Sequence, residues 1–337
     1  MKKNFAVPIF SLYLVLPVLA FGQVELTKFA GRAKVGSTGF QFLKIGVGAR
    51  AVGMAESFVS LADDATAIYY NPAGLIQMDK REVVCSLIKW PADINYGFLG
   101  AVMPTAHLGT FGVMVGALTT GDMKRTVPFK GWTGEYFSAT DWVVGATYAR
   151  SLTDKFSVGG NLKLIAEYLD NEELVNWAFD FGTMFDIGYR KMKFAMMITN
   201  FGPNAKYISE EFSMPTTFKI GMIVEAFDFE NNNMKITVEG QHPNDNVEQV
   251  AVGAEYLFHD VLALRAGYRN FLKLEEKDKI VQLDFQNTMD VKEPLDGFTF
   301  GAGLYVPFAG NQVRVDYAYA DMSYLQNAQR LTVTFNF

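Results

Sequence analysis

The stretch Arg330–Phe337 reads Arg-Leu-Thr-Val-Thr-Phe-Asn-Phe, and its polar and apolar residues alternate without interruption. Such a strand leaves unpaired backbone groups at the edge of an open sheet, whereas a closed barrel has no edge. In a barrel surrounded by lipid, its apolar residues would face hydrocarbon and its polar residues the lumen. The stretch therefore predicts a strand of an outer-membrane β-barrel.

Alternation of the same kind recurs upstream, between clusters of Gly, Asn, Asp and Pro. It defines fourteen segments: 82–90, 94–104, 107–121, 135–151, 154–170, 174–190, 192–201, 213–226, 233–241, 246–258, 261–270, 297–307, 311–320 and 328–337. An even number suits an antiparallel bacterial barrel with both termini in the periplasm. We therefore predict an all-β fold, in which residues 81–337 form a transmembrane antiparallel β-barrel of about fourteen strands.

A soluble β-sandwich has the same period and is the alternative. Aromatic residues near segment ends favour the barrel, because a membrane interface holds amphipathic rings there. These residues are Trp90, Trp142, Tyr148, Tyr168, Trp177, Tyr189, Tyr256 and Tyr268. The opposite face of the segments is rich in Gly, Ala, Thr and charged residues, which suits a crowded polar lumen better than a solvated sheet.

The predicted lumen carries charges of both signs in similar number. They are Lys163, Glu167, Lys219, Glu225, Lys235, Glu239, Glu255, Arg265, Arg269, Arg314 and Asp316. Opposite charges on facing strands attract, so we expect them to neutralise one another in cross-strand pairs. A self-paired lumen holds a plug more readily than it selects an ion. The pattern therefore predicts a closed barrel, from which any hydrophobic ligand would leave sideways.

Residues 1–22 are typical of an export signal peptide. The basic start Met1–Lys3 precedes the apolar stretch Phe5–Phe21, and Ala20–Gly22 provides a cleavage site of small residues. A membrane-spanning helix, the alternative, needs roughly 20 unbroken apolar residues, and two prolines interrupt this stretch. Loss of the two lysines would take the formal charge from −6 to −8. So acidic a chain is a poor candidate for nucleic-acid binding.

The alternation is absent from residues 23–80, where glycines are frequent. Backbone outside a closed strand ladder cannot face hydrocarbon, so we predict a hatch in the lumen. Within it we expect a short helix over Ala49–Leu61 and a turn at Asn71–Leu75. The pair Asp63 and Asp64 is a weak calcium candidate, because further spaced oxygen ligands are missing, and capping is the favoured role. No metal site is predicted.

The hatch segment resembles the start of outer-membrane proteins of the PorV/PorQ type over Phe42–Phe58 and Ala62–Leu75. The matching family positions are Gly46, Gly48, Ala49, Arg50, Gly53, Asp63 and Asp64, followed by the hatch motif Asn71, Pro72, Ala73 and Gly74. That family is similar to the FadL group of transporters for hydrophobic compounds. The resemblance implies a fourteen-stranded barrel, an N-terminal hatch, an Asn-Pro-Ala turn and a place in the lipid of the bacterial outer membrane.

Two functions follow from the resemblance. PorV-type proteins are accessory or shuttle components of type IX secretion, which bind the C-terminal signal domains of cargo proteins that cross through a separate translocon. FadL-type proteins are channels that pass hydrophobic small molecules through a lateral gap in the wall. We favour the secretion role because the hatch motif matches that branch, and the channel role is the alternative.

A long connection at residues 124–139 contains Phe129, Trp132, Tyr136 and Phe137. Long connections of such barrels are extracellular, and exposed aromatic side chains often bind partners. These four residues therefore form a candidate loop for partner binding, and the alternative is that the loop folds over the barrel mouth.

An enzymatic function is not expected. The three histidines, His107, His242 and His259, belong to no recognisable Ser/His/Asp arrangement or metal spacing. The single cysteine, Cys85, lies in an apolar run and is interpreted as a small buried or lipid-facing residue. Gly46 and Gly48 lack the third glycine of the dinucleotide-binding pattern. The sequence thus predicts a protein without catalytic residues or cofactor.

Overall fold

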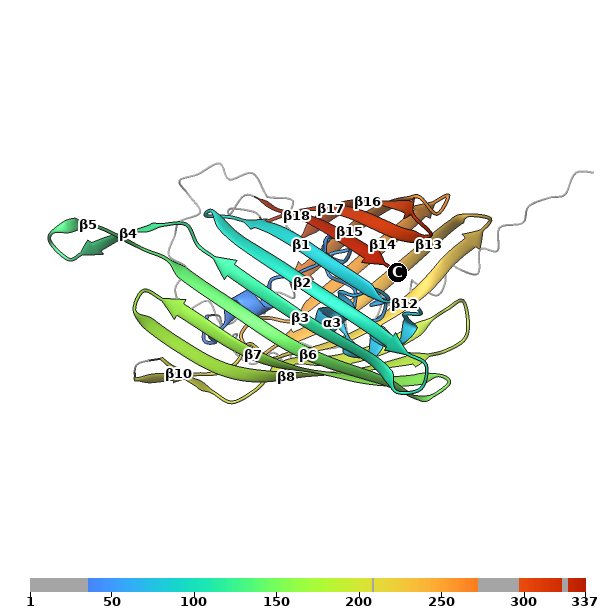
Figure 1. The fold of residues 1–337 in the computed structure, drawn as a ribbon, viewed down its shortest axis with the longest axis horizontal. Coiled ribbons are helices and arrows are strands. Elements are labelled where there is room, and N and C mark those ends of the chain that lie inside the picture. The colour runs from blue at the N-terminus through green and yellow to red at the C-terminus, as the bar shows by residue number, and fades with distance from the viewer. Residues whose placement is uncertain (1–35, 208, 272–296, 323–326) are drawn as a thin grey trace, which may run out of the picture.

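The computed structural model describes residues 36–207, 209–271, 297–322 and 327–337 (Figure 1). The predicted signal peptide, residues 1–22, lies outside them. No helix within these ranges has the length and apolar character needed to span a membrane.

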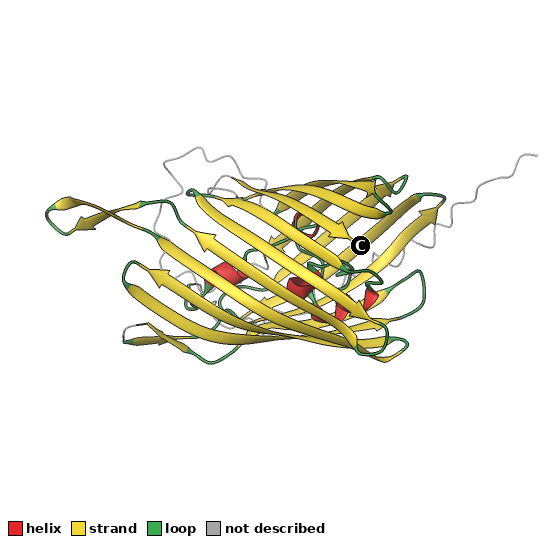
Figure 2. Ribbon diagram, in the orientation of Figure 1, coloured by secondary structure: helices red, strands yellow, loops and turns green. Residues whose placement is uncertain are grey.

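Fourteen antiparallel strands form a closed barrel, in which β1 pairs with β18 (Figures 1 and 2). The wall strands are β1 (Glu82–Trp90), β2 (Ile94–Thr105), β3 (Gly109–Thr119), β6 (Ala139–Thr153), β7 (Phe156–Leu169), β8 (Glu172–Asp186), β9 (Lys193–Phe201), β12 (Thr217–Phe229), β13 (Asn232–Pro243), β14 (Gln249–Phe258), β15 (Leu262–Phe271), β16 (Phe298–Phe308), β17 (Asn311–Asp321) and β18 (Asn327–Asn336). Each corresponds to one predicted segment, so the predicted fold class is confirmed.

Smaller elements complete the described chain. Two hairpins lie outside the wall, and four short helices precede it. The elements are β4 (Met123–Val127) with β5 (Gly131–Phe137), β10 (Ala205–Tyr207) with β11 (Glu210–Phe212), and the helices η4 (Gln41–Lys44), α2 (Ala49–Val52), α3 (Ala67–Tyr70) and η5 (Pro72–Gln77).

The C-terminal strand β18 has the predicted two-sided character. Leu331 and Val333 are 46% and 40% exposed on the outer surface, while Arg330 and Thr332 are buried inside. The outer surface of the barrel is therefore apolar, as lipid contact requires.

The two ends of the barrel differ in the length of their connections. At one end, where β1 begins and β18 ends, the chain turns within two residues between β6 and β7 and between β16 and β17. The long connections, including residues 202–216 and the β4–β5 hairpin, lie at the other end. Short turns are periplasmic in such barrels, so the long connections mark the extracellular end.

Residues 36–80 lie inside the barrel, where Figure 2 shows the short helices enclosed by strands. The predicted helix over Ala49–Leu61 is wrong, because α2 ends at Val52. Ala55 and Glu56 both adopt the left-handed conformation, with φ of 54° and 59°, which an α-helix cannot contain. The wall supplies replacement hydrogen bonds: the Ala55 backbone N–H donates to Thr299 Oγ1 over 2.9 Å.

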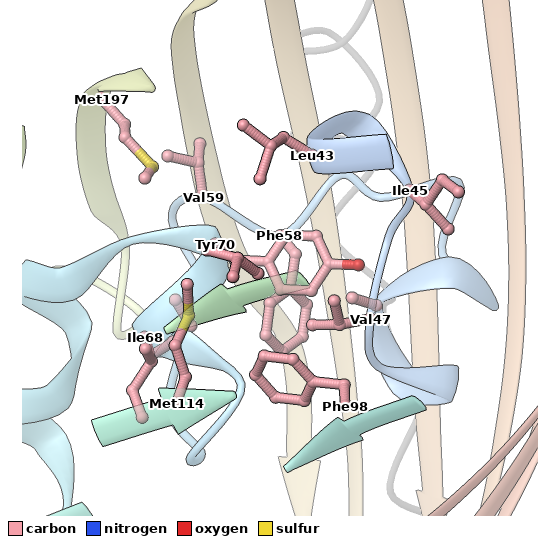
Figure 3. Close-up of a cluster of buried hydrophobic side chains, with 14 of the residues drawn as sticks. Leu43, Ile45, Val47, Phe58, Val59, Ile68, Tyr70, Phe98, Met114 and Met197 are labelled. Atoms are coloured by element: carbon pink, nitrogen blue, oxygen red, sulfur yellow. The ribbon is translucent and has the colours of Figure 1, made fainter. Parts of the chain in front are cut away.

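An apolar cluster joins the hatch to the wall (Figure 3). Val47, Phe58 and Ile68 of the hatch are fully buried, and they pack with wall residues that include Phe98 and Met114. The crowded polar lumen expected from the sequence is therefore wrong on the side of β2 and β3, where the lumen is apolar. Apolar inward residues there bury the apolar face of the hatch, and this burial stabilises its position.

Two further expectations are corrected. Trp90 faces the lumen and packs against the apolar cluster, instead of lying in an outer aromatic belt. Residues 124–139, predicted as a loop, contain most of the β4–β5 hairpin, and wall strand β6 begins only at Ala139. This hairpin projects away from the barrel rim, at the left of Figure 1, and does not fold over the mouth.

Candidate functional site

Arg50, the only charged residue of α2, connects the hatch to the wall. Its Nε and Nη2 donate to the two carboxylate oxygens of Glu255 on β14, over 2.8 and 2.7 Å. Its Nη1 donates to Asp64 Oδ2 over 3.0 Å and also contacts Asp63. The guanidinium is only 4% exposed, so these bonds are made away from water, where they are strong.

The same carboxylates bind arginines of the wall. Arg265 Nε donates to Glu255 over 2.7 Å, and Arg265 Nη1 donates to Asp316 over 2.7 Å. Arg314 then links Asp316 back to Asp64, with both distances 2.7 Å. We call this set the hatch-wall ion network: Arg50, Asp63, Asp64, Lys235, Glu255, Arg265, Arg314 and Asp316. Its four positive and four negative groups balance, as the sequence predicted for the lumen.

The two hatch aspartates are members of this network. Asp64 Oδ1 accepts from the Thr66 backbone N–H over 3.0 Å, which is the kind of local capping contact expected from the sequence. Its other oxygen binds Arg50 and Arg314, while Asp63 binds Arg50 and Lys235. Basic side chains therefore surround the pair. In the described ranges no group of His, Cys, Asp and Glu is arranged to hold a metal ion.

Neighbouring charges fix the ionisation of the hatch groups. Burial acts to raise the pKa of Asp63, but Arg50 and Lys235 outweigh it and hold that pKa below the ordinary value of 3.8. The pKa of Asp64 is likewise lowered: burial opposes the shift, and Arg314 and Arg50 overcome it. Both aspartates are therefore charged at neutral pH and contribute to holding the hatch.

Acid should loosen the hatch. Because the folded pKa values lie below 3.8, the stability that Asp63 and Asp64 contribute is present above that pH and is lost as the pH falls below it. We expect the difference in thermal unfolding midpoint between the unmodified protein and Asp63→Asn in detergent to be constant from about pH 7 to about pH 5 and to shrink below about pH 4. Asp63→Asn should show a smaller acid-dependent fall, and identical acid profiles for the two proteins would contradict this account.

The Asn-Pro-Ala turn anchors the hatch at β7 and β8. Asn71 Nδ2 donates to the carbonyls of Val59 over 2.8 Å and of Thr183 on β8 over 3.3 Å. Asn71 Oδ1 accepts from the Ala73 backbone N–H over 3.1 Å. The backbone of Pro72 lies so close to β7 that a Cβ at Gly159 would come within 2.4 Å of its carbonyl carbon. The hatch motif thus has a structural explanation.

Other family-motif residues also lie at close contacts. A Cβ at Gly74 would lie 2.1 Å from the Ala62 carbonyl oxygen, and one at Gly46 would lie 2.7 Å from atoms of Glu56 and Tyr70. Gly53 faces the backbone of β16. Gly48 lies against Thr66, and the Ala49 backbone N–H donates to Thr332 on β18. These positions therefore fit the hatch into the barrel.

Two cavities lie on the extracellular side of the hatch. The larger, about 330 Å³, lies between the hatch and strands β1, β15, β16, β17 and β18. The smaller, about 80 Å³, lies between the hatch and the wall from β7 to β15. Arg269 lines both cavities. Sequence reasoning missed them, because their walls combine the irregular hatch with strands far apart in the chain.

The smaller cavity borders an irregular part of the wall. The pairing of β8 with β9 shifts register next to Asn200, whose φ is 55°. Asp180 accepts from the Asn200 backbone N–H and from Lys163 Nζ, both over 2.7 Å. Beyond Phe201 the chain leaves the wall, and Ser213 accepts a hydrogen bond from the Gly39 backbone N–H of the hatch. Here β9 is bonded to β12 only over residues 193–199.

The predicted partner-binding residues lie apart from this cavity system, on the β4–β5 hairpin. Phe129 is fully exposed, and Trp132 and Tyr136 are each 53% exposed. Lys124 Nζ lies 5.3 Å from the Trp132 ring centre. Phe137 is half-buried under Arg125, so three of the four aromatic residues form an exposed surface.

No family model matches the chain, and no curated protein matches it. Solved structures do match. The toluene transporter TodX of Pseudomonas putida has a TM-score of 0.57 and 12% identity over 86% of this chain and 96% of its own. The toluene transporter TbuX of Ralstonia pickettii has a TM-score of 0.56 and 11% identity over 86% of this chain and 97% of its own. A FadL homologue of Pseudomonas aeruginosa has a TM-score of 0.50 and 12% identity over 86% of this chain and 98% of its own.

Identities this low establish the fold alone. They show that this chain shares its barrel fold with these proteins, and they give no support to a PorV/PorQ identity. The closed barrel and its apolar outer surface agree with this fold. The chain is a β-barrel of the bacterial outer-membrane type, as its C-terminal strand predicted.

Proposed function

We propose that this protein is an outer-membrane channel for small hydrophobic molecules, the alternative role considered from the sequence. Matching structures described as toluene transporters and as a FadL homologue support this proposal through their shared fold. They favour it over the secretion role, for which the comparisons offer no support.

A straight path through the barrel is closed by the hatch. Val47, Ala51 and Ala65 are fully buried in the lumen, and the hatch backbone touches wall glycines such as Gly267, where a Cβ would lie 2.3 Å from the Ala55 nitrogen. Protein interiors packed this closely have no room for a passing molecule. A small molecule therefore needs a route beside the hatch.

The two cavities provide the parts of such a route. The larger one lies at the extracellular side, Arg269 borders both, and the smaller one reaches Thr199 and Asn200 where β9 is irregular. This contact between a cavity and the irregular strand is the observation that carries the proposal. The β9–β12 ladder ends at the pair Thr199 and Thr217 beside the smaller cavity, and a hydrophobic molecule would leave sideways into the membrane just beyond that end.

Secretion remains the second candidate for one reason, the exposed aromatic surface of the β4–β5 hairpin. Phe129, Trp132 and Tyr136 offer a contact surface for a protein such as a cargo signal domain or a type IX translocon. An accessory of secretion needs no path for small molecules, so an uptake assay separates the two functions.

Filling the smaller cavity should block uptake. Thr199→Trp places an indole in a cavity of about 80 Å³, and we expect the rate of labelled toluene uptake by cells that express the protein to fall about tenfold, a barrier increase of about 1.4 kcal/mol. Met196→Trp is the matched control, because Met196 lies on the same strand and is 38% exposed on the outer surface.

Both variants are first checked for barrel assembly by their heat-dependent gel mobility. Uptake at the unmodified rate by an assembled Thr199→Trp protein would rule out a route through the smaller cavity. A wild-type protein that takes up no toluene above background cells would remove the channel function itself.

A further inference from the structure

The larger cavity contains two guanidinium groups with unused hydrogen-bond donors. Arg330 on β18 is 2% exposed, and its Nε donates to the Gly46 carbonyl over 3.0 Å. Its Nη1 has no hydrogen-bond partner among the residues that the structure describes, and the same holds for Nε of Arg269. Buried donors without partners are rare, because each loses its bonds to water without replacement. Because both side chains line the same cavity, an acceptor that enters this cavity can take up these donors.

The surroundings of Arg330 differ from those of the other buried arginines. Arg50, Arg265 and Arg314 each bind at least two carboxylates. Within the described ranges Arg330 has no carboxylate partner, and its guanidinium carbon lies 5.4 Å from the Trp90 ring centre. Stacking on an aromatic ring holds a guanidinium in place without neutralising it. Arg330 thus brings to this cavity a guanidinium that binds no carboxylate among the described residues.

Arg269 is partly occupied already. Its Nη2 donates to the Ala55 carbonyl over 2.7 Å and lies 3.5 Å from Glu56 Oε2. Glu56 and Asp321 also line the cavity, so acidic groups are present there, but Nε of Arg269 is left over. The two unused donors come from neighbouring parts of one cavity, and a carboxylate has two oxygens that accept from guanidinium groups.

The rest of the lining is apolar and suits a compact organic body. Val52, Ala55, Ala320 and Met322 line the cavity together with Trp90. At about 330 Å³ the cavity lies within the range of small-molecule sites, which are mostly apolar with a few polar groups that fix orientation. An inorganic anion would leave this apolar surface unused.

We propose that the larger cavity binds a small organic carboxylate, with the carboxylate at Arg330 and Arg269 and the apolar body against Val52, Ala320 and Met322. This inference rests on the proposed channel function and deepens it, because it names an anionic substrate class beside neutral hydrocarbons. The site is at the extracellular side of the hatch, where an incoming molecule would first be held.

Calorimetric titration of the full-length protein in detergent tests the site with benzoate and with benzamide, its neutral counterpart of the same shape. We expect benzoate to bind at least about tenfold more tightly. Arg330→Gln should lower benzoate affinity about tenfold or more and remove the preference over benzamide. Arg150→Gln, which removes an exposed charge on β6, should bind benzoate like the unmodified protein.

Equal affinities for benzoate and benzamide, or unchanged benzoate binding by Arg330→Gln, would overturn the proposal. Inorganic phosphate that binds as tightly as benzoate would overturn the organic part of it. Should Arg330→Gln fail to assemble, Arg269→Gln provides the second variant, with the same expected loss. Binding is measured without transport, so absent toluene uptake with intact benzoate binding would remove the channel function alone.

Discussion

Replacing Arg50 by alanine is expected to lower the free energy of unfolding by about 3 kcal/mol, the lower end of the range for a broken buried ion pair. Three carboxylates lose a partner: the half-buried Asp63 and the buried Asp64 and Glu255. Each keeps one cationic neighbour, respectively Lys235, Arg314 and Arg265, which is why the upper end of the range is not expected.

Urea unfolding in phospholipid vesicles, followed by tryptophan fluorescence, measures this loss. Arg125→Ala is the matched control, because Arg125 pairs with Asp170 and Glu135 on the exposed surface, where ion pairs contribute little. The free energy of unfolding of Arg50→Lys should lie between those of the unmodified protein and Arg50→Ala. An ammonium cannot bind both oxygens of Glu255 and the two aspartates with fixed geometry. An Arg50→Ala protein as stable as Arg125→Ala would show that the hatch-wall ion network does not hold the hatch.

The barrel could be predicted from the sequence because its pattern is local. Side chains alternate with period two, and Gly, Asn, Asp and Pro mark the turns, so all fourteen wall strands were found. The same reasoning placed Arg265 and Glu255 in the lumen, and these two residues pair directly across β14 and β15. Only segment ends moved, for example at Ala139, where a hairpin precedes the wall strand.

The hatch could not be derived in this way, because its conformation depends on distant residues. The apolar spacing of Ala49–Leu61 suits a helix, but Thr299 and Glu239 bind its backbone donors from strands about 180 to 240 positions farther along. These bonds support the left-handed turn at Ala55 and Glu56. The local helix propensity is overridden where tertiary contacts provide the backbone with better hydrogen bonds.

For the candidate site, too, the sequence predicted local features and did not predict contacts between distant residues. Asp63 and Asp64 were predicted as family-motif positions with a capping role, yet their partners Arg50, Arg314 and Lys235 come from three separate parts of the chain. Arg330 was read only as an inward residue of the last strand. That it lacks a carboxylate partner among the described residues, in contrast to the balanced network, is a property of the assembled lumen and has no signal in the sequence.

Replacing Gly159 by alanine is expected to destabilise the protein by about 3 kcal/mol, the upper end of the usual cost of overpacking. The added Cβ would lie 2.4 Å from the Pro72 carbonyl carbon and 2.5 Å from the Ala73 nitrogen. These are backbone atoms of the Asn-Pro-Ala turn, and the hydrogen bonds of Asn71 hold them, so they cannot rotate away as a side chain would.

Gly240→Ala is the control for the loss of a strand glycine, because its Cβ would meet only Ile220 Cγ2 at an ordinary 3.5 Å. We expect its urea midpoint to match that of the unmodified protein, while the midpoint of Gly159→Ala falls. If Gly159→Ala were as stable as the control, the turn would have to move aside at little cost. A hatch that moves so easily would reopen the straight path through the barrel, and the argument for a route beside it would lose its basis.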